Sequence, residues 1–428
     1  LAFVDVSTLK KEDMVQDNNG DWWIRKGRIK MDKEIIRLVD EVYPQMVEWR
    51  RHFHRFPELS GREKKTAQMI YDELWSFGVD EVQYMSGNTA VVGLIRGKNP
   101  ERKCLAIRAD IDALPVTEQT GLPFSSENEG VMHACGHDGH AAILLGTAKV
   151  LCGMRDRLNG SVKLIFEPHE ERIPGGAMAM LDQVVMENPH VDALIGLHIV
   201  PHEKCGVVAA KPGVISIGGA AITVEITGKG GHAATPHLSN DVVLAGAEYV
   251  VAVQQIVSRC IAPKDVGIVT VGCFEAGVGT AGNVMPDKAV LKVNARSYDL
   301  AVGELLKKKL YEIAEGMEKI SGCKFSLDYQ YIYQPVNNDP DCVELIRKAC
   351  TEDAGAEFDT ENGELFGGED VSVFMNETNT PGAFFMLLSG CEGDTVYPNH
   401  HPQFTWKEEA MAVGAKTFVS AAVRFLAE

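Results

Sequence analysis

Four separate motifs carry side chains from which a metal-dependent active site can be built. The densest is HACGHDGH at residues 133–140, which gathers three histidines, a cysteine and an aspartate into eight positions. Thiolate and imidazole groups are good ligands for borderline transition metals, and Cys135 and His137 are close enough in sequence to share one metal cluster. A helix-capping loop with a buried thiol and surface histidines would contain the same residues. This motif alone therefore leaves both interpretations open.

A pair of glutamates follows a predicted strand. Glu170 and Glu171 stand in EPHEER, directly after the apolar run SVKLIF. Binding crevices of open α/β sheets lie at the carboxyl ends of their strands. Because neighbouring residues on a strand point to opposite sides, one carboxylate can bind metal while the other faces the attacking water. The alternative interpretation is that both glutamates are solvated loop residues. The apolar strand that precedes them makes this interpretation less favoured.

The remaining candidate ligands are histidines. His198 ends the apolar run DALIGLHIV, and His400 and His401 stand in the late loop YPNHHPQF. A lone histidine at a strand end is more often a core residue than a ligand, and the late pair could be an exposed loop pair. The position of His198 at the same predicted sheet edge as the glutamate pair favours a ligand role.

Taken together, these residues divide the work of a hydrolase. Enough ligands for two adjacent metal ions come from Cys135, His137, Glu171, His198 and one late histidine. A bound metal lowers the pKa of water from about 15.7 to about 7 and polarises a carbonyl under attack. Glu170, which is not needed as a ligand, can take the proton and pass it to the leaving amine.

Alternating strands and helices carry these motifs. Strands of a buried sheet are predicted for the apolar runs at 89–97, 103–112, 161–171 and 192–200, and helices for 31–80 (broken at Pro57), 139–160 and 177–189. This alternation is typical of a three-layer α/β domain. From about residue 213 to about 333 the order becomes β-α-β-β-α-β, which predicts a ferredoxin-like unit.

The chain returns to the first pattern after this unit, so the unit is predicted to be an insertion. We expect residues 1–212 and 334–428 to form the catalytic domain, with 1–30 as an N-terminal extension, and residues 213–333 to form the inserted domain. The insertion carries His232 directly after Gly230 and Gly231, Asn283 in GNVMP and Arg296 in VNARSYD. Arg296 could clamp a carboxylate with two hydrogen bonds, although a surface salt bridge is nearly as favoured.

Composition excludes several classes of function. Lysine plus arginine total 42 against 60 aspartate plus glutamate, and a net charge of −18 repels phosphate backbones, so no nucleic-acid partner is expected. No stretch approaches 18 consecutive apolar residues, so no membrane span is expected, and the N-terminal residues lack a signal-peptide pattern. Ten scattered cysteines form no disulfide framework. Most sit in apolar runs, which predicts buried reduced thiols and a cytoplasmic protein.

In combination, the motifs resemble the M20 metallopeptidases, in particular the amidohydrolase branch with aminoacylase-like, hippurate and auxin-conjugate hydrolases. The matching stretches run in order from about residue 46 to the end: WRRHFHRFPELS, IRADIDALP, HACGHDGH, the PHEE pair, GLHIVP, GKGGHAATPH, GNVMPD, GGEDVSVFM and NHHPQF. This resemblance implies a three-layer, zinc-peptidase-like catalytic domain with an inserted ferredoxin-like domain that serves as lid and dimerisation unit.

The resemblance also implies roles for single residues. The implied metal ligands are Cys135, His137, Glu171, His198 and His400, and His400 is preferred over His401 because the family's ligand precedes the residue before the proline. Glu170 becomes the general base, and His232 is expected to stabilise the oxyanion in a neighbouring subunit's site. Asn283 and Arg296 match positions that contact substrate. One or two zinc, manganese or cobalt ions and a homo-oligomer, at least a dimer, are implied.

This chain departs from the family pattern in ways that bear on the substrate. It reads EPHEERIPGG where members often read QPAEE, so Glu167, His169 and Arg172 add charge beside the base. Our first hypothesis is hydrolysis of a small carboxylate-bearing N-acyl amino acid or aryl amide. An alternative is hydrolytic deamination of an aminobenzoate such as 5-nitroanthranilate, with release of ammonia. A catalytically silent binding protein is a third hypothesis, against which the intact Glu170 argues.

Overall fold

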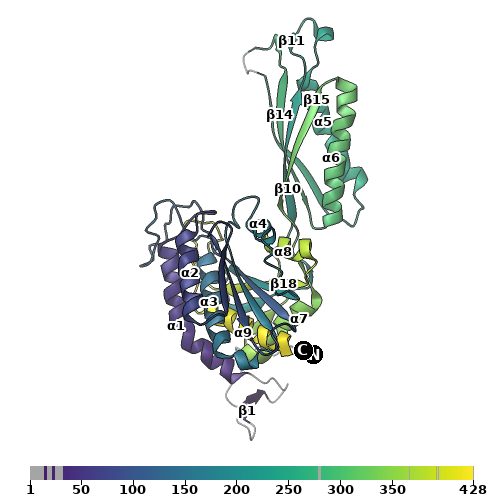
Figure 1. The fold of residues 1–428 in the computed structure, drawn as a ribbon. Coiled ribbons are helices and arrows are strands. Elements are labelled where there is room, and N and C mark those ends of the chain that lie inside the picture. Colours follow the sequence, from purple (N-terminus) through teal and green to yellow (C-terminus); the bar gives the residue numbers. More distant parts are fainter. Residues whose placement is uncertain are drawn as a thin grey trace. The chain divides into compact units, whose positions relative to one another are not determined.

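The computed structural model describes residues 14–16, 22–24, 32–277, 281–365, 367–391, 393 and 395–427. The chain divides into two compact units: the first comprises Leu1–Ile215, Asn337–Leu365 and Val373–Glu428, and the second comprises Ser216–Val336 and Phe366–Ser372 (Figure 1). Within the predicted N-terminal extension, only the paired strands β1 (Met14–Gln16) and β2 (Trp22–Ile24) fall among the described residues.

An eight-stranded mixed sheet forms the centre of the first unit. Its strand order is β17-β8-β18-β7-β5-β6-β4-β3. The bounds are β3 (Glu81–Met85), β4 (Ala90–Arg96), β5 (Cys104–Asp110), β6 (Ser161–Glu167), β7 (Ala193–Val200), β8 (Cys205–Ala209), β17 (Glu357–Asp359) and β18 (Gly382–Ser389). Strands β5, β6, β7 and β18 run parallel, so their carboxyl ends share one edge. The α/β class with a central sheet is confirmed.

Three long helices pack together beside this sheet: α1 (Lys33–Arg55), α3 (His137–Gly153) and α9 (Ala410–Ala427). Further helices of the first unit are α2 (Lys64–Ser76), α4 (Ala177–Leu181) and α7 (Pro340–Lys348), and most of α8 (Val371–Thr378) also belongs to it. Helix α9 is long and apolar enough to cross a membrane, a feature that the search for unbroken apolar runs missed. Met411, Phe418 and Leu426 of α9 belong to the core of the unit, which accounts for its composition.

Local chain chemistry sets the ends of the elements near the site. Asp32 caps α1 by accepting hydrogen bonds from the backbone N–H groups of Glu34 and Ile35. Gly136 precedes α3 with a φ of 92°, a left-handed conformation that costs glycine little. Helix α3 therefore begins at His137, and the histidine motif lies partly in its first turn rather than wholly before it.

Two predicted elements are shorter than the sequence indicated. Strand β6 ends at Glu167, so Glu170 and Glu171 lie in the following turn and strand alternation does not separate them. The predicted helix at 177–189 ends at Leu181. Val184 and Asn188 both have positive φ values, which a helix cannot accommodate.

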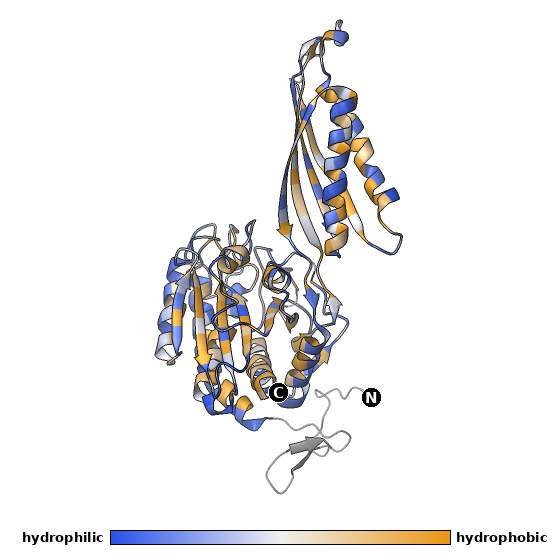
Figure 2. Ribbon diagram, turned by 45° about the vertical axis from the view of Figure 1, so that its right-hand side comes forward, coloured by the Kyte–Doolittle hydropathy of each residue, from blue (hydrophilic) through white to orange (hydrophobic). Residues whose placement is uncertain are grey.

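The second unit is a four-stranded antiparallel sheet of order β12-β14-β10-β15. Along the chain its main elements are β10 (Gly218–Thr227), α5 (Val242–Gln255), β12 (Gly267–Ala276), β14 (Lys288–Ser297), α6 (Leu300–Ser321) and β15 (Lys324–Tyr333). Alternate residues of β10, such as Ile222 and Val224, are buried with Leu310 of α6 in a separate core. In Figure 2 the helix α6 carries both polar and apolar residues, as expected for a helix that covers one face of a sheet.

A buried charge network crosses the middle of the first unit's sheet. The Nε atom of Arg108 donates to Glu167 at 2.6 Å, and its Nη1 atom donates to Asp110 at 2.7 Å. All three side chains are fully buried. The network joins the carboxyl ends of β5 and β6, and the turn that carries Glu170 follows directly after β6.

Removing one partner from this network tests its contribution to the fold. We expect Glu167→Ala to lower the free energy of unfolding by about 3–5 kcal/mol, because it removes charge from around a buried guanidinium. The exposed pair Arg96–Glu81 provides the control, and Glu81→Ala should change stability by less than about 1 kcal/mol. Urea unfolding measures both values, and equal losses would contradict the assigned role of the buried network.

Candidate metal centre

All six predicted site residues of the first unit meet at the carboxyl edge of the parallel strands. His198 lies near the end of β7, Cys135 and His137 lie at the start of α3, the glutamate pair follows β6, and His400 comes from a late loop. Ligand atoms of three triplets lie within 4.8 Å of one another: Cys135, His137 and His198; Cys135, Glu171 and His400; His137, Glu170 and Glu171.

Both buried histidines present the same ring nitrogen to the centre. Nδ1 of His137 lies 3.0 Å from the carbonyl oxygen of Asp112, and Nδ1 of His198 lies 2.8 Å from the carbonyl oxygen of Ile199. A carbonyl only accepts, so each Nδ1 carries a proton, and in the neutral ring each Nε2 keeps a lone pair. Nε2 of His198 faces the Cys135 sulfur at 3.4 Å. Nε2 of His137 is buried without a hydrogen-bond partner among the described residues.

Electrostatics at the centre favour a bound cation. Burial and the negative charges of Glu171 and Glu170 raise the pKa of the Cys135 thiol well above its usual value. Burial opposes the charged form of His137, but Asp110 and Asp112 outweigh it and raise its pKa to about 10. A divalent cation inverts both effects, because it favours the thiolate and displaces the imidazolium proton. The donor set therefore fits a divalent transition metal.

Of the two late histidines, His400 is the one that reaches the centre. Its Nε2 atom lies 3.1 Å from Oε1 of Glu171, and its backbone N–H donates to the carbonyl of Ala134 at 2.7 Å. The φ of His400 is 70°, an uncommon conformation for a residue other than glycine. His401 instead stacks on Tyr397 with ring centroids 4.6 Å apart.

Sequence reasoning gave no role to two aspartates in the stretch IRADIDALP. Asp110 accepts a hydrogen bond from Nδ1 of His140 at 2.6 Å, and Nε2 of His140 accepts the Ile199 N–H at 2.8 Å. Both nitrogens of His140 are therefore engaged, and His140 supports the site rather than binding metal. Asp112 accepts the N–H of Glu171 at 3.0 Å and fixes the glutamate turn. Asp110 and Asp112 alternate with apolar residues at the end of a predicted strand. This pattern was the signal that could have identified them.

Charge beside the predicted base is arranged differently from the expectation. Glu167 is fully buried in its ion pair with Arg108, Arg172 is exposed and His169 is partly buried. The charge that Glu167 was expected to add beside the base is therefore paired with the guanidinium of Arg108. The physical reason is that Glu167 is the last residue of β6 and faces the interior of the unit.

The three predicted site residues of the second unit fall into two places. His232 and Asn283 are neighbours, because the N–H of Ala233 donates to the Asn283 carbonyl at 3.1 Å and β11 (Gly231–His232) pairs with β13 (Val284–Met285). Arg296 is on β14, where its Nε donates to Asn294 at 2.9 Å. The roles of all three residues stay predictions.

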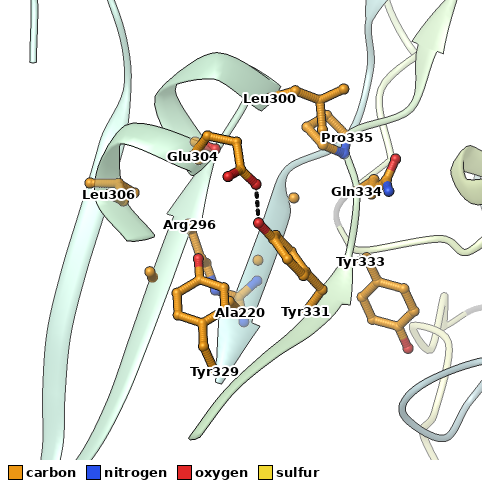
Figure 3. Close-up of a pocket in the computed structure, with 15 residues that line it drawn as sticks. Ala220, Arg296, Leu300, Glu304, Leu306, Tyr329, Tyr331, Tyr333, Gln334 and Pro335 are labelled. Carbon is orange, nitrogen blue, oxygen red and sulfur yellow. Dashed lines mark hydrogen bonds between the residues drawn. The ribbon is translucent and has the colours of Figure 1, made fainter. Parts of the chain in front are cut away.

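Arg296 also lines a small cavity within the second unit (Figure 3). Tyr331 and Glu304 point toward each other across it and form a hydrogen bond. The cavity volume of about 30 Å³ suits one or two water molecules. It is too small to enclose an acylated amino acid.

Comparison with known proteins agrees with this fold. Residues 106–424 match the model of peptidase family M20/M25/M40, and the chain belongs to this family. The N-acyl-L-amino acid amidohydrolase of Geobacillus stearothermophilus is 40% identical over 306 residues, which cover 72% of this chain and 81% of that protein. The chain is accordingly a metal-dependent hydrolase of the amidohydrolase type.

Two crystal structures show the same fold. One, from methicillin resistant Staphylococcus aureus, has a TM-score of 0.85 and 36% identity and covers 92% of this chain and 100% of its own. The other, the YXEP protein of Bacillus subtilis, has a TM-score of 0.75 and 29% identity and covers 91% of this chain and 99% of its own. YXEP is described as a dinuclear metal-binding peptidase of family M20.

A serine at position 135 tests the thiolate ligand. We expect Cys135→Ser to weaken metal binding by more than about 100-fold. Replacing a residue that only supports the metal ligands already weakens metal binding by up to about 100-fold. Competition with a chelator measures the affinity. Cys152→Ser changes a half-buried thiol elsewhere in α3 and should leave the affinity unchanged. Equal affinities for the three proteins would remove Cys135 from the ligand set.

Proposed function

We propose that this enzyme hydrolyses the amide C–N bond of a small carboxylate-bearing N-acyl amino acid or aryl amide. The observation that carries the proposal is the position of Glu170, which is 5% exposed and has an oxygen within 4.8 Å of ligand atoms of His137 and Glu171. A carboxylate beside a metal centre, but not needed to complete it, fits a general base. The named activity of the Geobacillus relative supports the same substrate class.

One or two zinc, manganese or cobalt ions are the proposed cofactors. Their proposed ligands are Cys135, His137, Glu171, His198 and His400, which the triplets of neighbouring donor atoms support. A divalent metal held there supplies Lewis acidity and lowers the pKa of a nearby water to about 7. The dinuclear description of the YXEP structure supports a pair of ions.

The protein's own residues supply positioning and proton transfer. Glu170 accepts a proton from the attacking water and delivers it to the leaving nitrogen as the C–N bond breaks. The bond from the Glu171 N–H to Asp112 fixes the turn, so that Glu171 faces His400, and Glu170 is proposed to serve the attacking water. The carbonyl acceptors at Nδ1 of His137 and His198 fix both rings in the ligand tautomer.

We further propose that the second unit is a ferredoxin-like lid. Its order β10-α5-β12-β14-α6-β15 and its strand order support this architecture. Nδ1 of His232 accepts the Ala234 N–H at 3.0 Å, so the neutral ring carries its proton on Nε2 and can donate to an oxyanion in a neighbouring subunit. Asn283 and the exposed guanidinium of Arg296 are proposed to bind the substrate, Arg296 at its carboxylate.

Exposed apolar side chains on the second unit support a homodimer through this unit. Val243, Leu244 and Val251 of α5 and Phe274 of the edge strand β12 are all exposed. Unpaired edge strands with apolar neighbours favour association. We also propose a cytoplasmic location, which the ten free thiols support.

The competing hypotheses have less support. The hypothesis of aromatic deamination relied on charged residues beside the base. One of them, Glu167, forms a buried ion pair with Arg108 instead. A silent binding protein would not need a buried carboxylate at the position of Glu170. Ammonia release from an aminobenzoate, with no amino acid release from any amide, would nevertheless favour deamination.

Replacing the proposed base separates catalysis from metal binding. We expect Glu170→Gln to lower kcat by about 10²- to 10⁴-fold, because an amide cannot take the proton, while the metal content stays constant. Amino acid release from a panel of N-acyl amino acids and aryl amides is the assay, with ammonia followed in parallel. Glu203→Gln changes an exposed glutamate and is the control. Unchanged turnover in Glu170→Gln would refute the mechanism.

The dimer surface can be tested with one charge. We expect Val251→Glu to convert the dimer to a monomer in sedimentation experiments, since a carboxylate at an apolar interface lacks a partner. Ile320→Glu places the same charge at an exposed apolar position of α6 and should leave the dimer intact. A dimer that persists in Val251→Glu would place the interface elsewhere.

A further inference from the structure

A second buried carboxylate, Glu63, contacts the turn that carries Glu170. Glu63 is 0% exposed, and its Oε1 atom accepts the Gly61 N–H at 2.7 Å and the His169 N–H at 2.9 Å. Asp112 accepts the Glu171 N–H at 3.0 Å and the Ser60 hydroxyl at 2.7 Å. The backbone N–H groups on both sides of Glu170 are thus bound by buried carboxylates.

The placement of Glu63 at a helix start is unusual. It is the N-cap residue of α2, yet its side chain makes no capping hydrogen bond. Glu58 instead accepts the N–H groups of Lys65 and Thr66 at 2.8 and 2.9 Å. Because Glu58 satisfies the helix, the carboxylate of Glu63 is available to the catalytic turn. The residues that directly follow the segment WRRHFHRFPELS thus contribute Glu63 to the turn that carries Glu170.

The turn needs such support because its backbone is held in an uncommon conformation. His169 has a φ of 66°, a strained conformation for a residue other than glycine, which persists only where its surroundings enforce it. The hydrogen bond from the His169 N–H to Glu63 acts one peptide unit before Glu170. A shift of this peptide would move the carboxylate of Glu170 relative to the attacking water.

We infer that Glu63 is a positioning residue that fixes the general base Glu170 through the His169 N–H. The inference rests on the proposed function, because it assumes that Glu170 is the base. The required feature of Glu63 is an acceptor oxygen rather than a charge. Its other oxygen, Oε2, is buried without a hydrogen-bond partner among the described residues, and burial together with Asp112 raises the pKa of Glu63 to about 7.

This account predicts a specific pattern among variants of Glu63. Glu63→Ala should lower kcat by about 10²-fold, the cost of a misplaced catalytic group, with KM within about twofold and metal content unchanged. Glu63→Gln retains the acceptor oxygen and should keep kcat within about threefold of the wild type. Asp72→Ala removes an exposed carboxylate elsewhere on α2 and should leave kcat unchanged.

Each outcome decides for or against the inference. If Glu63→Ala does not fold, Glu63→Asp replaces it, and kcat should fall because the shorter side chain withdraws from His169. Wild-type kcat in Glu63→Ala, or an equal loss of kcat in Glu63→Gln, would overturn the inference, as would loss of metal. An active Glu170→Gln variant would refute the proposed function itself, whereas an inactive Glu170→Gln beside an active Glu63→Ala would refute only the role of Glu63.

Discussion

The arrangement of side chains in the first unit depends on how the negative charge buried at the ends of β5 and β6 is stabilised. Asp110, Asp112 and the Glu170–Glu171 pair lie close together where water has little access, and burying unpaired charge is costly. Arg108 pairs with Asp110 on one side, and the imidazole of His137 lies 3.2 Å from Asp112 on the other. The remaining charge faces the ligand atoms of the proposed centre. A divalent cation is the natural counter-charge for this arrangement.

This constraint assigns a separate task to each acidic residue. Asp110 orients His140, which in turn accepts the backbone N–H of Ile199 beside His198. Asp112 and Glu63 bind the backbone on either side of Glu170. Glu170 and Glu171 are the carboxylates that we propose to serve the attacking water and the metal. The support comes from elements far apart in sequence, which is why Glu63 at the start of helix α2, distant along the chain from the metal motifs, contacts the turn of Glu170.

Sequence reasoning found the candidate cluster because parallel strands bring their carboxyl ends to one edge. Strong apolar runs defined β5, β6 and β7, and the residues directly after them had to converge. The supporting contacts could not be predicted, since the partners of Asp112, His140 and Glu63 are chosen by packing and not by spacing. The helix expected at 177–189 failed because Val184 and Asn188 adopt positive φ, which the apolar periodicity does not reveal. The start of α3 at His137 depended on the left-handed conformation of Gly136.

The most direct test of the central claim is anomalous diffraction from crystals grown with zinc or manganese. The account predicts one or two strong anomalous peaks within bonding distance of Cys135 Sγ, Nε2 of His137, His198 and His400, and a carboxylate oxygen of Glu171. Glu170 should lie beside the peaks without coordinating them. Fully loaded crystals with no peak there, or a peak coordinated by His140 or by Glu170 in place of Glu171, would contradict the account.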